Sequence, residues 1–303
     1  MTLSMNNEPA KDIGYELGQV KSGINTLLET ILPDGAERPE SLHKAMRYAV
    51  LGGGKRLRAI LCVWTHEILG GKHRAAAMTA GCAIECLHAY TLIHDDLPCL
   101  DDDDIRRGRP ACHREYGEAV ALLAGDALQA YAFQLISELK GPEVKDILSA
   151  VKLLSETAGS KMLVGGQVAD IEGEGKRPDE DLVRFIHARK TAELISTSMG
   201  IGAILSGSGR DLIIQIRDAG RKAGLAFQIA DDILDVRGDE KLVGKGLRKD
   251  DEKGKITWPA CFGLGSAEKM AGDLIDDSIE IVRSAGDDGR IESLFRLFLE
   301  RVS

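Results

Sequence analysis

Apolar residues recur with a helical period in nearly every long segment of this chain. The first example is the stripe Ile13, Leu17, Val20, Ile24, Leu27 and Ile31, which ends before Pro33. Similar patterns predict helices over residues 39–51, 57–69, 74–93, 115–139, 142–171, 180–205, 210–236, 267–284 and 291–302. No run alternates as a strand would, and no long linker divides the sequence. We therefore expect an all-α fold, a single domain over residues 1–303 with long helices around a deep central cleft.

The composition agrees with a helical globular protein and excludes two other classes. Only 4% of the 303 residues are aromatic, while Ala, Leu and Ile are abundant, which favours helices. A net charge of -9 without a basic arm argues against nucleic-acid binding. No apolar run approaches the ~18 uninterrupted residues of a membrane span, so we expect no stable membrane insertion. The first twelve residues lack an apolar signal core, and the six cysteines show no zinc-ligand spacing, so we expect a cytoplasmic protein.

Two aspartate-rich segments, residues 94–101 and 228–235, each end a mostly apolar helical stretch. Their carboxylates are Asp95, Asp96 and Asp101 in the first segment and Asp231, Asp232 and Asp235 in the second. Clustered carboxylates repel one another and resist leaving water, so they need cations between them. Oxygen ligands suit hard divalent ions, and Mg²⁺ most often arrives with a phosphate. The sequence therefore predicts a magnesium site that both segments share.

The local geometry of the two segments differs. Asp231 and Asp235 are four residues apart and share a helix face, although this pattern alone favours a solvated face. Pro98 disfavours a helix at Leu97, so the first helix should end or bulge there, and the turn should bring Asp101 back towards Asp95. Residues 102–104 also fit a charged surface loop.

Basic residues accompany the acidic segments. The stretch Gly-Gly-Gly-Lys-Arg-Leu-Arg at residues 52–58 joins two helices. It lacks the Ser/Thr and the preceding strand of a P-loop, yet glycines followed by bases can still bind phosphate. Further bases are Arg106, Arg107 and Arg109, then Lys190, Lys245 and Lys255. Each of these alone favours a solvated surface charge. Together with the carboxylates they indicate polyanions held partly by metal and partly by bases.

The ordered set of motifs resembles the trans-prenyltransferases, the short-chain polyprenyl diphosphate synthases of the bacterial farnesyl diphosphate synthase type. The motifs are Gly-Gly-Gly-Lys-Arg-Leu-Arg, His-Asp-Asp-Leu-Pro-x-Leu-Asp-Asp-Asp-Asp-x-Arg-Arg-Gly-Arg-Pro, Gly166-Gln167, Lys190-Thr191 and Phe227-Gln228-x-x-Asp-Asp-Ile-Leu-Asp. The resemblance covers nearly the whole chain. One departure is Ala59, where the family usually has Pro, and this affects a helix start more than the chemistry.

The resemblance implies an isoprenoid synthase type I fold, usually as a homodimer. It implies a Mg²⁺-dependent, head-to-tail condensation of isopentenyl diphosphate with dimethylallyl or geranyl diphosphate, giving farnesyl diphosphate and pyrophosphate. The six aspartates would hold three Mg²⁺ ions on the allylic diphosphate from opposite walls, and Lys190 is counted with them as catalytic. Other implied allylic-diphosphate contacts are Arg106, Lys190, Thr191, Gln228, Lys245 and Lys255. The implied isopentenyl diphosphate contacts are Lys55, Arg58, His88 and Arg107.

Two residues just before Asp95 are candidates for the floor of the product pocket. One helical turn is about 5.4 Å, close to one isoprene unit, so bulk at Tyr90 or Thr91 can limit chain length. Tyr90 can equally pack against a neighbouring helix, and His88 can be a buried structural histidine. We expect farnesyl diphosphate as the main product, with geranylgeranyl diphosphate as the alternative. A class I terpene cyclase and an inactive regulatory partner are less favoured, because both aspartate motifs and the basic site are intact.

Overall fold

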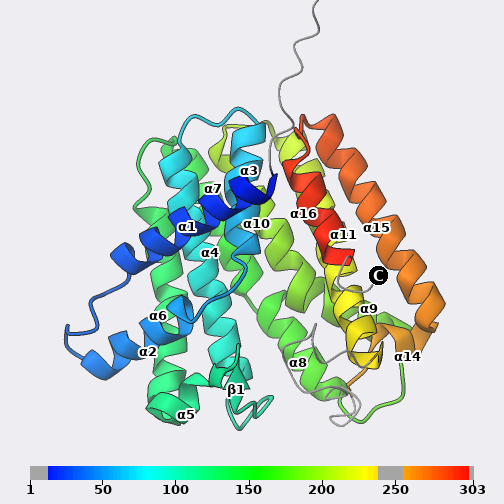
Figure 1. Cartoon of the computed structure of the whole chain (residues 1–303), viewed down its shortest axis with the longest axis horizontal. Helices are drawn as coiled ribbons and strands as arrows, with labels where there is room; N and C mark the ends of the chain where they lie inside the picture. Colours follow the sequence, from blue (N-terminus) through cyan, green and yellow to red (C-terminus); the bar gives the residue numbers. More distant parts are fainter. Residues whose placement is uncertain (1–12, 238–254, 300–303) are drawn as a thin grey trace, which may run out of the picture.

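The computed structural model describes residues 13–237 and 255–299, and almost all regular structure in them is helical (Figure 1). The elements are α1 (Ile13–Ile31), α2 (Glu40–Leu51), α3 (Leu57–Ile68), α4 (Arg74–Asp95), β1 (Ile105–Arg106), β2 (Arg109–Pro110), α5 (Cys112–Tyr116), α6 (Glu118–Ser137), α7 (Val144–Ala158), α8 (Leu163–Gly173), α9 (Glu180–His187), η1 (Ala188–Ala192), α10 (Glu193–Leu205), α11 (Arg210–Arg237), α14 (Trp258–Phe262), α15 (Leu264–Ser284) and α16 (Arg290–Leu299). The all-α prediction is confirmed.

Helices α3, α4, α10 and α11 form the centre of the bundle. Every residue of α10 is buried, which explains why its sequence after Glu193 is apolar or small on all sides. Glycines let these helices approach closely. A Cβ at Gly202 of α10 would lie 2.3 Å from the carbonyl oxygen of Cys62 in α3, and one at Gly220 of α11 would lie 2.8 Å from the Cα of Ser196 in α10. These four helices are thus closely packed in the core, and their ends extend beyond it.

Two of the predicted helices are each divided in the structure. Residues 115–139 were expected as one helix, but Gly117 adopts a φ of 83° between α5 and α6. Residues 142–171 form α7 and α8, separated at Gly159 and Met162, whose backbones are not helical. The short helix α14 was not predicted. Helices α5 and α14 have five residues each, too few to show a period, so these two were missed because of their length.

A short hairpin was also not predicted. Strands β1 and β2 are antiparallel, and Arg106 pairs with Arg109. The two turn residues Arg107 and Gly108 have φ values of 54° and 72°, which is typical of a two-residue hairpin turn of type I′. The Arg107 guanidinium donates to the carbonyl oxygen of Gly53. The hairpin therefore lies against the glycine-rich connection between α2 and α3.

A single π-turn, η1, joins α9 to α10. A Cβ at Gly166 of α8 would lie 2.7 Å from the backbone nitrogen of Lys190. A Cβ at Gly224 of α11 would lie 2.6 Å from the Cα of Ala192. Glycines on both sides thus let α8 and α11 enclose the bulge closely. Such bulges are frequent at functional sites, and this one carries the predicted residues Lys190 and Thr191.

Two of the described helices, α4 and α6, are long and apolar enough to cross a membrane by length and composition. In α4, 78% of the apolar window is buried inside the bundle, whereas in α6 the value is 39%. The core position of α4 accounts for its apolar sequence. The exposed apolar residues of α6 include Leu122 and Leu123.

Candidate active site

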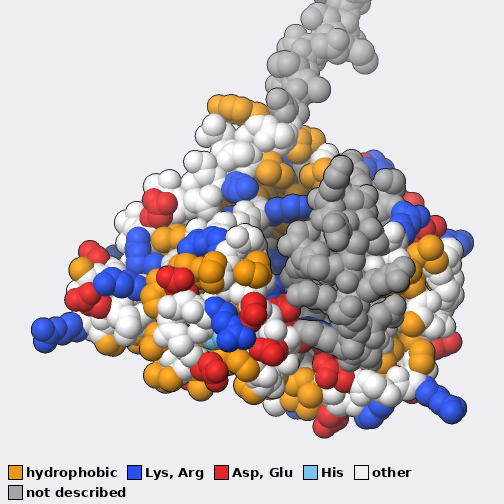
Figure 2. Space-filling view, turned by 60° about the horizontal axis from the view of Figure 1, so that its bottom comes forward, with side chains coloured by type: hydrophobic (Ala, Val, Ile, Leu, Met, Phe, Trp, Pro, Cys, Tyr) orange, Lys and Arg blue, Asp and Glu red, His pale blue; other side chains and the backbone are white. Residues whose placement is uncertain are grey.

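A polar cavity lies between the C-terminal ends of α4 and α11, at the lower end of the bundle in Figure 1. Its walls also come from α8, from η1 and from the residues just before α14. The charged residues that line it are Arg58, Asp95, Asp101, Arg106, Asp170, Lys190, Asp231, Asp232 and Lys255. Figure 2, which turns this end forward, shows acidic and basic side chains close together in the middle of the face. The cavity thus unites both predicted aspartate segments and most of the predicted bases.

Asp95 and Asp101 both face this cavity. Helix α4 ends at Asp95, and the backbone nitrogen of Asp101 donates to the carbonyl oxygen of Asp95 at 2.8 Å. The predicted return of the chain after Pro98 is therefore confirmed. Burial away from water raises the pKa of Asp95; Lys190 opposes this rise and Asp101 adds to it. Two carboxylates held together under these conditions would be stabilised by a cation.

Asp96 is not among the described residues that line the cavity. Its carboxylate accepts hydrogen bonds from the Arg106 Nε at 2.9 and 3.1 Å and also from the terminal nitrogen of that side chain. Asp103 also lies 3.5 Å from this guanidinium. Asp96 is 2% exposed, and its position fixes Arg106 at the edge of the cavity. A direct metal contact by Asp96 stays a prediction, since Arg106 already binds its carboxylate.

In the second aspartate segment, both carboxylates of the Asp-Asp pair line the cavity, but only one of them is fully buried. Asp231 lines the cavity, and Asp235 is half-buried one turn further along α11. Asp232 is buried, and it accepts from the backbone nitrogen of Trp258 at 2.8 Å and from the Gln228 Nε2 at 3.1 Å. Asp232 therefore ties the end of α11 to the start of α14.

A hydrogen-bond chain crosses from η1 to α11. The hydroxyl of Thr191 donates to the Gln228 Oε1 at 2.7 Å, and Gln228 in turn donates to Asp232. Neighbouring polar side chains are thereby fixed before any ligand binds, which is the condition for electrostatic stabilisation of a developing charge. Both Thr191 and Gln228 line the cavity, and their contact with an allylic diphosphate stays a prediction.

Asp170 is a cavity residue that the sequence reasoning missed. It is 9% exposed, and its Oδ2 lies 2.6 Å from the Lys190 Nζ and 3.8 Å from the Lys255 Nζ. Lys255 also donates to Asp101 at 3.1 Å. Asp170 thus positions both Lys190 and Lys255, two bases that the sequence indicated without relating them to each other. The only available signal was its spacing, one helical turn after Gly166 on α8.

An apolar pocket adjoins the polar cavity. The two share Arg58, Leu92, Asp95, Lys190 and Thr191. Its other walls come from the α4 residues Tyr90, Thr91 and His94 and from the α8 residues Leu163, Val164, Gln167, Val168 and Ile171. The Tyr90 and His94 rings pack edge to face with centroids 5.0 Å apart. Polar and apolar binding regions are therefore continuous, and both candidate floor residues lie in the apolar one.

A cluster of bases borders the cavity beside the glycine-rich connection. The Arg58 Nη1 lies 3.3 Å from the His88 Nε2, and Arg107 contacts Gly53. Burial holds the pKa of His88 well below its ordinary value of 6.5, and Arg58 and Arg107 lower it further. His88 is therefore neutral at neutral pH, and the positive charge here belongs to the arginines. Lys55 is exposed, and Lys245 lies outside the described residues.

Arg56, in contrast, is structural. It adopts a φ of 57° and is 5% exposed. Its side chain donates to Glu85 at 3.2 Å, to Asn25 at 2.9 Å and to the carbonyl oxygen of Val50 at 2.7 Å. The basic run therefore points Arg56 into the core, while Lys55 remains outside.

The donors on the cavity wall fit a hard divalent cation. Asp95, Asp101 and Asp231 are carboxylates, the ligand type that Mg²⁺ prefers, and the raised pKa of Asp95 indicates negative charge that the protein compensates incompletely. These three residues would hold such an ion.

His187 makes the stability of this region dependent on pH. The ring stacks on Trp258, and its Nε2 lies 3.3 Å from Asp232. Burial lowers the pKa of His187 from 6.5 to about 4. Since the unfolded state binds the proton more strongly, this histidine should reduce the unfolding free energy as pH falls from 6.5 to 4, by up to about 3 kcal/mol. The loss should level off below pH 4.

A comparison with His187→Gln isolates this effect, because glutamine keeps a donor for Asp232 but does not titrate. Denaturant unfolding at a series of pH values should give a difference between wild type and variant that falls with decreasing pH. Parallel pH profiles of the two proteins would contradict a neutral, buried His187.

Known proteins resemble this chain both in sequence and in fold. Residues 39–298 match the family model of the polyprenyl synthetases. The chain is 40% identical over 277 residues to farnesyl diphosphate synthase of Geobacillus stearothermophilus, covering 90% of this chain and 92% of that protein. It is 43% identical over 251 residues to geranylgeranyl pyrophosphate synthase 11 of Arabidopsis thaliana, covering 80% and 70%. The structure resembles a Helicobacter pylori geranyltransferase solved with magnesium and isoprenyl diphosphate, with a TM-score of 0.81, 30% identity and 97% coverage of both chains.

Proposed function

This chain belongs to the polyprenyl synthetase family, and we propose that it is a prenyltransferase that condenses isopentenyl diphosphate with dimethylallyl and geranyl diphosphates to give farnesyl diphosphate. One observation carries the proposal. The cavity with carboxylates on two walls opens directly into an apolar pocket. A ligand that fills both must have a polyanionic head and a hydrocarbon tail, as an allylic diphosphate does.

The two walls of the polar cavity would share the allylic diphosphate. Asp95, Asp101 and Asp231 would hold Mg²⁺, for which we propose three ions, and bound Mg²⁺ would supply charge neutralisation for the leaving group. Lys190 and Lys255 would contact the diphosphate oxygens directly, and Asp170 holds both ammonium groups in place. The apolar walls would exclude water from the allylic cation that remains after ionisation.

Isopentenyl diphosphate would bind beside this site, at the bases near the glycine-rich connection. Arg58 lines the polar cavity and contacts His88, so it lies between the two proposed diphosphate sites. Neutral His88 can donate a hydrogen bond to a diphosphate oxygen, and an approaching anion would raise its pKa. No metal is needed here, because guanidinium groups bind phosphate oxygens in pairs.

A geranylgeranyl diphosphate synthase is the alternative assignment within the family, since several relatives have that name. The higher coverage of the farnesyl diphosphate synthase relative and the aromatic Tyr90 in the apolar pocket both favour the shorter product. A terpene cyclase and an inactive partner remain less favoured, because the aspartates and bases of both proposed sites are present.

We further propose a cytoplasmic homodimer. All six cysteines are free thiols, as expected in a reducing compartment. Leu122 and Leu123 of α6 are 45% and 56% exposed, and a second copy of the chain would cover them.

A product assay tests the activity. Purified protein with isopentenyl diphosphate, Mg²⁺ and either dimethylallyl or geranyl diphosphate should yield farnesyl diphosphate, detected by mass spectrometry. Cyclic hydrocarbons from an allylic substrate alone would support the cyclase instead. A folded protein that gives no product with any primer would support the inactive partner.

The two proposed diphosphate sites should separate by mutation. We expect Lys55→Ala or Arg58→Ala to raise the KM for isopentenyl diphosphate by about tenfold or more, equivalent to ~1.4 kcal/mol. Lys190→Ala should mainly affect the allylic substrate or kcat, because its amine faces the aspartates. Steady-state kinetics with each substrate varied in turn measures both effects. Equal changes in both KM values for all three variants would contradict the assignment of two sites.

A further inference from the structure

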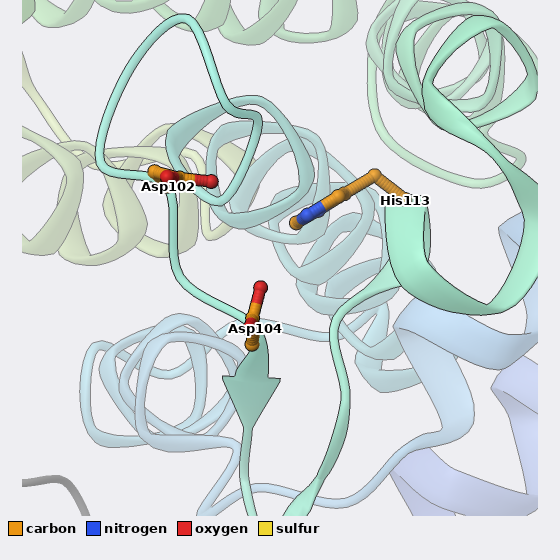
Figure 3. A group of neighbouring side chains, drawn as sticks. All are labelled: Asp102, Asp104 and His113. Carbon is orange, nitrogen blue, oxygen red and sulfur yellow. The ribbon is translucent and has the colours of Figure 1, made fainter.

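A second group of possible metal ligands lies outside the polar cavity, on the loop after Asp101 and at the start of α5. Asp102 and Asp104 belong to the loop, and His113 is the second residue of α5. The backbone nitrogen of Ala111 donates to the carbonyl oxygen of Asp104 at 2.8 Å, which holds the two segments together. One ligand atom from each of the three side chains lies within 4.8 Å of the other two, and Figure 3 shows the side chains converging.

His113 provides the independent sign of a ligand. Its side chain is 4% exposed, and neither ring nitrogen has a hydrogen-bond partner within residues 13–237 and 255–299. A buried polar group without a partner costs free energy, so a nitrogen in this position needs an explanation. The ring points into the space between the two carboxylates (Figure 3). A neutral imidazole presents a lone pair there, which a cation can accept.

The charges near the ring also favour a cation. Arg114 lies 2.5 Å from the Asp104 Oδ1 and 3.9 Å from the Asp102 Oδ1. One guanidinium against two carboxylates leaves a net charge of about -1 on these three side chains. The Asp102 and Asp104 side chains are 60% and 63% exposed, which gives an ion a path from solvent and lets both carboxylates rotate.

We propose that Asp102, Asp104 and His113 bind a borderline divalent cation such as Zn²⁺. An imidazole with two carboxylates suits Zn²⁺, whereas Mg²⁺ prefers oxygen ligands in an octahedron. Ligand atoms around tetrahedral Zn²⁺ lie roughly 3.4 Å apart, which small rotations of the two exposed aspartates would reach. A water molecule would complete the coordination. None of the three side chains is among the described residues that line the polar cavity, so this site is distinct from the proposed magnesium site.

The ion would act as a clamp. It would join the loop that carries Asp101 to α5, and it would oppose movement of this segment away from the bundle. Because a metal that binds only the folded state stabilises it, Zn²⁺ should raise the unfolding midpoint of the protein.

The test uses the full chain, stripped with a chelator and kept in excess Mg²⁺. Zn²⁺ is then titrated while bound zinc is measured by equilibrium dialysis and the imidazole signals of ¹⁵N-histidine-labelled protein are followed by NMR. We expect one bound Zn²⁺ per chain that shifts the His113 ring signals, assigned by their absence in His113→Gln. Unchanged His113 signals would overturn the proposal, and so would the same shift in Mg²⁺ alone.

Variants then identify the ligands. Loss of an outer-sphere partner costs about 10–100-fold in metal affinity, so Asp102→Asn or Asp104→Asn should weaken Zn²⁺ binding at least about tenfold. Both residues are exposed, so these variants test the site even where His113→Gln does not fold. Asp146→Asn on α7 is the matched control, and Asp231→Asn should keep this binding because it alters only the polar cavity. Wild-type affinity in both loop variants would refute the ligand set.

Discussion

Asp231→Asn should lower kcat by at least about a hundredfold while the protein stays folded. Asp231 lines the cavity opposite Asp95 and Asp101, and asparagine preserves its size but removes its charge. The control is Asp211→Asn, which removes the same charge from an exposed position at the start of the same helix. EDTA should abolish wild-type activity, and Mg²⁺ should restore it. Full activity after complete removal of divalent ions would refute the metal-dependent mechanism.

Asp95→Asn should abolish activity but stabilise the metal-free protein against unfolding. The folded state raises the pKa of Asp95 above its ordinary value, so its negative charge destabilises the metal-free fold at neutral pH. The variant should therefore unfold at a higher temperature than wild type in EDTA, although its turnover is lost. Added Mg²⁺ and inorganic diphosphate should reverse the order, because they stabilise wild type more. A variant less stable than wild type in EDTA would contradict this account.

Tyr90→Ala should lengthen the product by at least one isoprene unit. Tyr90 is 8% exposed, lines the apolar pocket and packs against His94, one helical turn from the end of α4 at Asp95. Removal of the ring takes bulk from the pocket wall near the end of α4, where one helical turn of about 5.4 Å is close to the length of one isoprene unit. Mass spectrometry of the products should show a shift from farnesyl towards geranylgeranyl diphosphate.

Tyr90→Phe is the control, since it keeps the ring and should keep the product length. Truncation of a buried aromatic residue can cost about 3 kcal/mol, so unfolding midpoints must be measured alongside the assay. Thr91→Ala tests the other candidate on the same pocket wall. If wild type and Tyr90→Ala give the same chain lengths, the pocket floor lies elsewhere and the farnesyl assignment loses its structural support.

The helical architecture could be predicted because each long helix carries its own apolar period. Helix α1 occupies the predicted range, and the breaks at Gly52 and Gly70 fall where glycines interrupt the pattern. The hairpin, α14 and the division at Gly117 were missed. Their conformations depend on one or two residues and on distant contacts, such as that of Arg107 with Gly53. Period analysis needs several turns, so it cannot detect elements of this size.

The sequence predicted those features of the candidate site that depend on residues close together in the chain. The sequence by itself determined that two acidic segments follow buried helices, and the turn after Pro98 fixed Asp101 near Asp95. Helix spacing also aligned Asp231 with Asp235. These relations depend on neighbours within a few residues, where backbone geometry leaves few alternatives.

Only the tertiary structure decided how each carboxylate of the two Asp-Asp pairs is held. Asp95, Asp231 and Asp232 line the cavity, whereas Asp96 binds Arg106, and Asp232 also accepts from a backbone nitrogen 26 residues away. It also revealed Asp170 and the orphaned ring of His113. The periodicity of a single helix gives the angle between its side chains, but not the rotation of that helix against its neighbours. That rotation is set by packing across the whole bundle, where glycine contacts such as Gly202 with Cys62 fix the distances.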